Sequence, residues 1–232
     1  MKKILVLNGN SYFNAVRNLG IPSFDFIDFV ENPHEYGLVL FTGGEDVDPS
    51  MYGETSPKRL CSSNLHRDLH EKGIYEIALN NGIKMTGICR GSQFINVMNG
   101  GRMIHHLSGH AGADHLMETL KDDKLIPVNS AHHQMSIPSK DGVVVGWASE
   151  KRSNIYYGDK DLPVEWSGPE TEALLYPKTQ CFAVQYHPEW LSDDHPGYRW
   201  YWEAVRDFLN MPIEYFTILY KGEKVQKHMT FS

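Results

Sequence analysis

Several common functional signatures are missing from this 232-residue sequence. Cysteine occurs only 3 times, at wide spacings and without a CxxC pair, which argues against a disulfide framework and against a cysteine-based zinc site. No apolar run approaches the roughly 20 residues that span a bilayer. The apolar run that follows the two N-terminal lysines is too short for a signal peptide. We therefore expect no membrane partner and a cytoplasmic location.

Basic charge is also scarce, with 22 Lys and Arg against 29 Asp and Glu and a net charge of -7. Nucleic acids and anionic membranes attract basic surfaces, so no nucleic-acid partner is expected. The Gly43-Gly44 pair is not followed by either glycine-rich phosphate-binding pattern. We therefore expect no nucleotide cofactor, and no other cofactor is indicated.

Short apolar runs alternate with helical patterns along the chain. This alternation predicts an α/β fold, a three-layer sandwich of flavodoxin-like type whose mostly parallel central sheet is flanked by helices. We expect one domain over residues 1–232, with 211–232 as a C-terminal extension. The predicted strands are 3–7, 37–41, 84–88, 143–145 and 181–184, and the predicted helices cover about 68–82, 92–98 and 198–209.

The ends of two segments carry more specific signals. Asp68 and Glu71 resemble a capping box, and Gly82 lies where a helix C-terminal cap is expected. Residues 214–220 and 224–231 flank a Lys-Gly-Glu turn and predict a C-terminal β-hairpin. Such a hairpin could close the edge of the sheet or form a dimer or partner surface.

The strongest local motif is Gly-Ile-Cys-Arg-Gly at 87–91, between a predicted strand and a predicted helix. This is the context of a nucleophile elbow, in which a sharp turn projects Cys89 at the carboxyl edge of the sheet. The N-terminus of the following helix favours a thiolate there. Cys181 lies in an apolar strand and is expected in the core, whereas Cys61 lies in a polar loop without a base nearby in sequence.

A nucleophile needs a base, and the base needs an orienting group. His187 and Glu189 follow the apolar run 181–184 and are two residues apart, so both project to the same side of an extended chain. This pair can aim an imidazole at a thiol while a carboxylate holds the ring.

Four motifs occur in the order found in a known family. They are residues 42–54, 87–93, 128–134 and 185–189. Together they resemble the class I glutamine amidotransferase-like superfamily, and within it the peptidase C26 branch, which includes γ-glutamyl-γ-aminobutyrate hydrolases. The resemblance covers about residues 1–210, although segment 8–36 is shorter than in that family.

The resemblance implies a role for each matching position. Cys89 is then the nucleophile, His187 the general base and acid, and Glu189 the orienting carboxylate. The oxyanion hole uses the backbone N–H groups of Gly44 and Arg90. The substrate-binding positions are Gln93, Ser130, Ala131 and His132.

Two enzymatic functions follow from that resemblance. One is a hydrolase of γ-glutamyl amides that acts through a glutamyl thioester on a small-molecule substrate. The other is a glutaminase subunit that delivers ammonia to a separate synthetase, for nucleotide or sugar modification. Both a homodimer and a synthetase partner are compatible with the sequence. A binding module without turnover is disfavoured because all three triad positions are present.

A dense group of histidines lies outside these motifs, at 105, 106, 110 and 115. Histidine clusters can bind metal, but this spacing matches no zinc motif and the elbow chemistry needs no metal. We therefore expect no metal and place these residues on a surface or pocket-rim loop. Residue Trp190 is the tryptophan expected near the site, because it follows Glu189.

Overall fold

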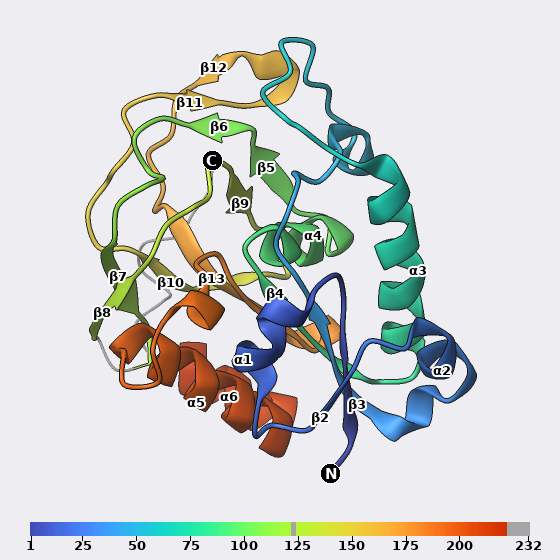
Figure 1. The fold of residues 1–232 in the computed structure, drawn as a ribbon. Helices are drawn as coiled ribbons and strands as arrows, with labels where there is room; N and C mark the ends of the chain where they lie inside the picture. The colour runs from blue at the N-terminus through green and yellow to red at the C-terminus, as the bar shows by residue number, and fades with distance from the viewer. Residues whose placement is uncertain (122–123, 222–232) are drawn as a thin grey trace.

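A nine-stranded sheet forms the centre of the computed structural model, which describes residues 1–121 and 124–221 (Figure 1). The strands follow one another across the sheet in the order β2 (Ile21–Ser23), β1 (Lys3–Val6), β3 (Tyr36–Phe41), β4 (Lys84–Ile88), β14 (Cys181–Val184), β13 (Thr171–Tyr176), β10 (Val143–Ala148), β7 (His115–Thr119) and β8 (Leu125–Val128).

The sheet has a parallel part and an antiparallel part. The first five strands, β2 to β14, pair in parallel, and their 2-1-3-4-5 order is that of flavodoxin-like folds. Strands β13, β10, β7 and β8 extend this part with antiparallel pairs. The predicted α/β sandwich is confirmed, and β4 and β14, which precede the site motifs, are neighbours at its middle.

Helices cover both faces of the sheet because its strands are apolar on both sides. Ile4 and Val6 of β1 point into one core cluster, and Leu5 and Leu7 into the other. The first face carries α1 (Phe13–Val16), α5 (Pro196–Asn210) and α6 (Ile213–Lys221). The second carries α2 (Phe26–Glu31), α3 (Leu65–Asn80) and α4 (Arg90–Met98).

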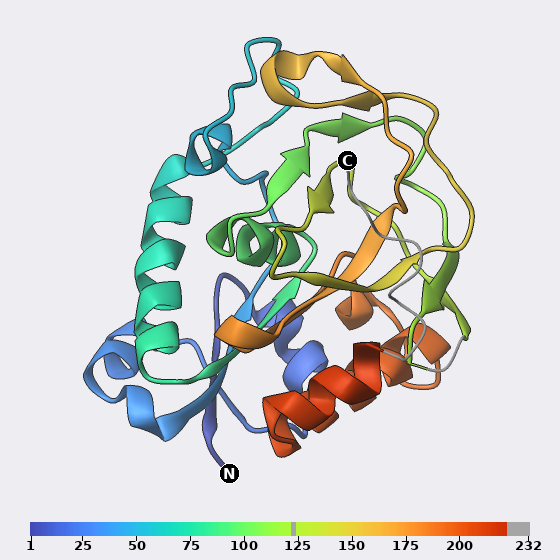
Figure 2. The same ribbon diagram turned by 180° about the vertical axis from the view of Figure 1, so that it is seen from behind.

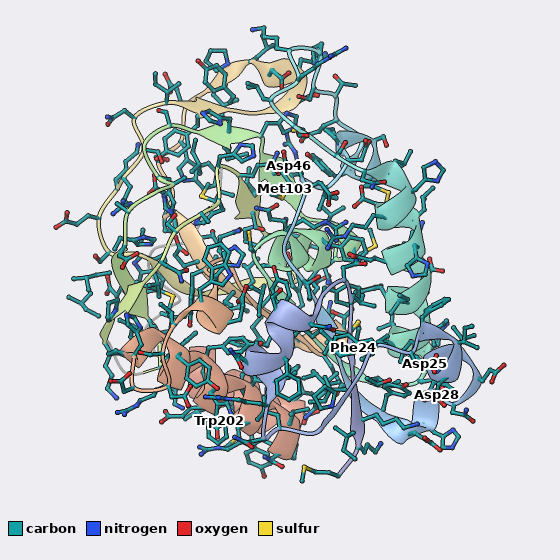
Figure 3. All side chains as sticks on the ribbon, viewed as in Figure 1. Phe24, Asp25, Asp28, Asp46, Met103 and Trp202 are labelled. Carbon is teal, nitrogen blue, oxygen red and sulfur yellow. The ribbon has the colours of Figure 1, made fainter. Side chains whose placement is uncertain are left out.

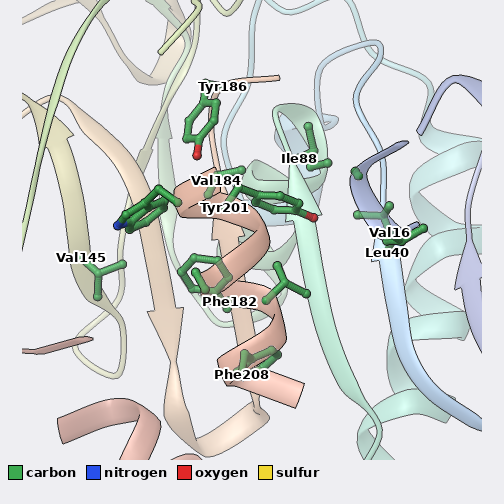
Figure 4. Close-up of a cluster of buried hydrophobic side chains, with 14 of the residues drawn as sticks. Val16, Leu40, Ile88, Val145, Phe182, Val184, Tyr186, Tyr201 and Phe208 are labelled. Carbon is green, nitrogen blue, oxygen red and sulfur yellow. The ribbon is translucent and has the colours of Figure 1, made fainter. Parts of the chain in front are cut away.

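The predicted C-terminal hairpin is wrong where it can be judged, because residues 213–221 form helix α6. Phe216 and Tyr220, four residues apart, are fully buried on one side of α6 and stack with ring centroids 4.2 Å apart. Phe216 also meets Phe182 of β14 and Phe208 of α5, which Figure 4 shows in the same core. The aromatic residues that suggested a strand therefore have helical spacing. Residues 222–232 lie outside the described part.

Helix α3 begins earlier than predicted. Its N-cap is Asn64, whose side chain accepts a hydrogen bond from the Arg67 N–H at 3.3 Å, so the predicted capping box at Asp68 and Glu71 is wrong. Those two carboxylates are instead fully buried inside the protein. Gly82 does follow the helix, in the left-handed conformation with φ +63°.

Smaller elements cover the carboxyl end of the parallel strands, and Figure 2 shows them at one end of the molecule. Figure 3 labels Asp46 at this end and Trp202 toward the opposite end. The small strands at this end are β5 (Arg102–Ile104), β6 (His106–Leu107), β9 (Met135–Ile137), β11 (Tyr156–Tyr157) and β12 (Pro163–Val164). The 3-10 helices, which lie in loops throughout the described chain, are Asn10–Tyr12, Pro33–Glu35, Pro49–Tyr52, Asp159–Asp161, Pro177–Thr179 and Pro188–Trp190.

In the described part of the chain, no helix is both long and apolar enough to cross a membrane.

Candidate active site

Cys89 lies on a strained turn between β4 and α4. Its φ of 54° and ψ of -113° fall outside the regions that non-glycine residues normally occupy. The two motif glycines allow the tight packing around this turn. A Cβ on Gly87 would lie 2.5 Å from the Gly91 carbonyl, and one on Gly91 would lie 2.1 Å from the Phe41 oxygen. The turn therefore has the geometry of a nucleophile elbow.

His187 and Glu189 lie beside this turn, just after β14. The Glu189 Oε1 atom is 2.7 Å from His187 Nδ1, and both residues are buried. Burial lowers the pKa of His187, but hydrogen bonds to Cys89 and Glu189 and the charges of those two groups outweigh it and raise the pKa to about 9. The structure thus brings the three predicted triad residues together.

Two neighbours fix the position of His187, and one of them was not singled out from the sequence. The Asn129 side chain accepts from the His187 N–H and donates to the His187 carbonyl, both at 2.8 Å. Trp190 stacks on the imidazole with ring centroids 3.8 Å apart and an interplanar angle of 3°. Because Trp190 is 60% exposed, its ring covers the imidazole on the solvent side.

The predicted oxyanion positions lie on the two segments that flank the thiol. Arg90 is the first residue of α4, where a backbone N–H has no partner within the helix. Gly44 lies in the loop after β3 with φ +138°, and a Cβ there would come within 2.2 Å of Arg67 Nη1. Tyr12 supports the same loop, since its hydroxyl accepts from the Gly43 N–H at 3.0 Å.

A buried ion-pair network holds both of these segments. The Arg90 guanidinium, 1% exposed, bonds Asp68 and Glu71 of α3. Arg67 bonds Glu71 at 2.8 Å and donates to the Gly43 carbonyl at 2.9 Å. The Arg90 side chain is therefore held by two carboxylates of α3, and its backbone N–H is the group that the predicted oxyanion role uses.

A pocket of about 180 Å³ opens at Cys89. Of the predicted oxyanion and substrate positions, only Ser130 does not line it, because its hydroxyl donates to the His110 carbonyl at 3.1 Å. Of the four further lining residues, Glu45, Asp46 and His133 lie within the sequence motifs but were given no role there, and Ser62 lies outside every motif. The pocket is lined by Gly44, Glu45, Asp46, Ser62, Cys89, Arg90, Gln93, Ala131, His132 and His133.

The histidine group is not on a surface loop, so that prediction is wrong for three of its members. His105, His110 and His115 are 0%, 0% and 9% exposed. His105 bonds Glu54 at 2.9 Å and Asp161 at 3.1 Å. These carboxylates are about 50 residues away along the chain, so local sequence patterns could not show the pairing.

The comparison with known proteins agrees with this architecture. A family profile described as peptidase C26 matches residues 34–156, more than half of the chain. The chain belongs to the peptidase C26 family. Through it the protein falls in the class I glutamine amidotransferase-like superfamily, as the ordered motifs predicted.

Two relatives of this peptidase C26 chain illustrate the range of the similarity. NtpR of Enterococcus hirae is 29% identical over 182 residues, which cover 65% of this chain and 66% of that protein. A putative glutamine amidotransferase of Mycobacterium tuberculosis is 30% identical over 191 residues, covering 70% of this chain and 56% of that protein. The match thus spans between about half and two thirds of these relatives.

Solved structures support the fold of the C26 chain. A glutamine amidotransferase from Thermotoga maritima has a TM-score of 0.54 at 16% identity, with 93% of this chain and 90% of that chain covered. At this identity the likeness shows a shared glutamine amidotransferase fold alone.

Proposed function

We propose that the protein is a cysteine hydrolase that cleaves γ-glutamyl amide bonds and releases glutamate and an amine. The observation that carries this proposal is the buried contact between Cys89, on its strained turn, and His187, which Glu189 orients. Membership of the peptidase C26 family supports the same chemistry.

The reaction begins when the Cys89 thiolate attacks the γ-carbonyl carbon of the substrate. The carbonyl oxygen becomes an oxyanion, which accepts hydrogen bonds from the backbone N–H groups of Gly44 and Arg90. Loss of one such donor typically costs about 100- to 1000-fold in rate. With a pKa of about 9, His187 is protonated at neutral pH and donates its proton to the departing amine.

The second half of the reaction removes the glutamyl group from the enzyme. His187, now neutral, takes a proton from water, which attacks the glutamyl thioester and releases glutamate; the sulfur leaves as the Cys89 thiolate, and His187 is protonated again. Glu189 holds the ring through Nδ1 in both steps, so that Nε2 faces the reacting atoms. Gln93, Ala131 and His132 lie on the pocket wall where they can contact the glutamyl group.

The test is a panel of γ-glutamyl amides, with glutamine included, assayed for free glutamate with the purified protein alone. Cys89→Ala should lower turnover at least about 1000-fold with an unchanged circular dichroism spectrum. The matched control is Cys61→Ser, which removes another accessible thiol and should retain activity. The proposal would be refuted if Cys89→Ala kept full activity. It would also be refuted if no compound of the panel released glutamate, whether or not a synthetase partner was added.

An alternative within the same chemistry is a glutaminase subunit that passes ammonia to a synthetase. The relative named a putative glutamine amidotransferase favours it. Under this alternative, glutamine hydrolysis appears only when a synthetase partner is added, whereas the stand-alone hydrolase acts on γ-glutamyl amines without one. A Cys89 thiol that resists alkylation, or that a glutamine analogue does not protect, would instead favour a binding module.

A further inference from the structure

A second cluster of buried polar side chains lies behind the wall of the catalytic pocket. Its members come from four separate segments and are at most 9% exposed. None of them has a role in the hydrolysis proposed above except His132, which also lines the pocket. The cluster consists of His110, His115, His132, Glu170 and Glu172.

Three imidazoles converge on one carboxylate oxygen in this cluster. The Nε2 atoms of His110, His115 and His132 lie 2.9, 3.0 and 3.5 Å from Glu172 Oε1. In a tetrahedral zinc site with bonds of about 2.0–2.1 Å, neighbouring ligand atoms are about 3.3 Å apart. The three distances from Glu172 Oε1, 2.9, 3.0 and 3.5 Å, lie on either side of this separation. The ligand atoms of His110, His115 and Glu172 also lie within 4.8 Å of one another.

The opposite ring nitrogens are arranged as in metal sites. His110 Nδ1 is 3.0 Å from Glu170 Oε2, and His132 Nδ1 is 2.9 Å from the Gln134 carbonyl. Metal-bound histidines usually donate their second N–H to a carboxylate or a carbonyl in this way. These contacts orient both rings with Nε2 toward Glu172.

The cluster also contains polar atoms whose bonding is incomplete. Because the Gln134 carbonyl can only accept, the proton of a neutral His132 lies on Nδ1, and Nε2 is a bare lone pair. That lone pair faces the Glu172 carboxylate, so two acceptors oppose each other. Within residues 1–121 and 124–221, His132 Nε2, His115 Nδ1 and Glu172 Oε2 are buried without a hydrogen-bond partner. Buried polar atoms normally have partners, and a bound cation would remove the conflict between His132 and Glu172.

We propose that His110 Nε2, His115 Nε2 and Glu172 Oε1 bind a zinc ion, with His132 Nε2 as the fourth ligand. Three imidazole nitrogens and one carboxylate oxygen are ligands that Zn²⁺ accepts in tetrahedral geometry. The ion is structural, because it lies behind the pocket wall and the cysteine chemistry needs no metal. Its route in is the surface cavity of about 410 Å³ that His115 lines together with Gly109 and Arg152.

The zinc ion joins segments that the catalytic site depends on. His132 forms part of the substrate pocket wall. The Glu172 carbonyl accepts a hydrogen bond at 2.7 Å from the N–H of Gln185, two residues before His187. Bound metal therefore connects the pocket wall with the strand pair that carries the catalytic histidine.

A second group, Cys61, His105 and Asp161, also brings potential ligand atoms within 4.8 Å of one another. Both ring nitrogens of His105 already bond carboxylates, at 2.9 and 3.1 Å. Among the described residues, no ring nitrogen or carboxylate oxygen of this group is buried without a hydrogen-bond partner, unlike His132 Nε2 and Glu172 Oε2. This group therefore serves as the internal comparison.

The test is titration of the chelator-treated full-length protein with Zn²⁺, followed by calorimetry and by thermal unfolding. One equivalent should bind and raise the melting temperature. His115→Ala and Glu172→Gln should each weaken binding at least tenfold, while Cys61→Ser and Cys89→Ala should retain it. The protein loaded with Co²⁺ should show the visible absorption of a tetrahedral site.

Three outcomes would overturn the proposal. They are no Zn²⁺ binding, binding that His115→Ala leaves unchanged, and binding that is lost in Cys61→Ser. The first outcome would mean that the positive charge of a protonated His110 compensates the negative charges of Glu170 and Glu172 without a metal ion. Because His115 lies at the edge of the cluster, its variant decides the question even if Glu172→Gln fails to fold. The measurement is of binding, so its result is independent of the proposed hydrolase activity.

Discussion

The clamp that Asn129 forms on the backbone of His187 gives the most direct test of how the site is held. Asn129→Ala removes two hydrogen bonds of 2.8 Å and leaves the N–H and carbonyl of a buried residue without these partners. An unsatisfied buried group costs about 1–3 kcal/mol. Since Asn129 itself is only partly buried, water can replace some of each bond, and the expected loss is about 2–3 kcal/mol in unfolding free energy.

The same substitution should also lower activity. Without the clamp, the His187 ring is free to shift relative to Cys89, and a displacement of about 1 Å can cost about 100-fold in rate. We expect kcat for a γ-glutamyl amide to fall about 10- to 100-fold, with KM changed less, because Asn129 does not line the pocket. Denaturant unfolding and steady-state kinetics measure the two effects.

Asn210→Ala is the matched control for this prediction. Its side chain also donates to a carbonyl at 2.8 Å, that of Arg206, but on the exposed surface of α5. The control should change stability by no more than about 0.5 kcal/mol. If Asn129→Ala matched this control in both stability and kcat, the reasoning about the clamp would be wrong.

Two further predictions concern buried charges. Arg90→Met should destabilise the protein by about 3–5 kcal/mol in denaturant unfolding, because it leaves Asp68 and Glu71 buried without that cation; a loss below about 1 kcal/mol would contradict it. Glu189→Gln should lower the pKa of His187, which the wild-type site raises from 6.5 to about 9. A raised histidine pKa stabilises the folded protein fully at pH values below the pKa of the unfolded chain, so the difference in unfolding free energy between wild type and Glu189→Gln should be largest below pH 6.5 and shrink as pH rises through about 9. A difference that grows over this pH range would contradict the prediction.

Local patterns were sufficient for the elbow and for the parallel strands except β2, whose three residues were not predicted as a strand. Gly87 packs against Gly91, only four residues away, although Gly91 itself packs against the distant Phe41. The strand before the turn is buried from Met85 to Ile88. His187 and Glu189 do meet, at 2.7 Å, but not in the predicted extended chain, because Glu189 lies in the 3-10 helix Pro188–Trp190 that follows His187. Their catalytic roles remain predictions.

Partners distant in sequence were not predictable in the same way. Glu172 is fully buried among histidines from other segments, yet in the sequence it is one acidic residue in a strand that was not predicted. The strands β7 and β13 were missed because polar residues interrupt their apolar runs, among them His115 and Glu172, which meet inside the protein. Strand β8 was missed because it has only 4 residues and contains Pro127. Helix α6 was misassigned because aromatic residues favour strands when their contacts are unknown.

The ion pairs of α3 determine which substitutions would disturb the backbone around Cys89. Arg67 and Arg90 connect the same carboxylate, Glu71, to the loop of Gly44 and to the start of α4. The separation of the Gly44 and Arg90 backbone N–H groups, the proposed oxyanion donors, is therefore fixed by a helix that does not line the pocket. Substitutions at the pocket rim should therefore leave these two N–H groups in place, whereas one substitution at Glu71 should loosen the positions of both.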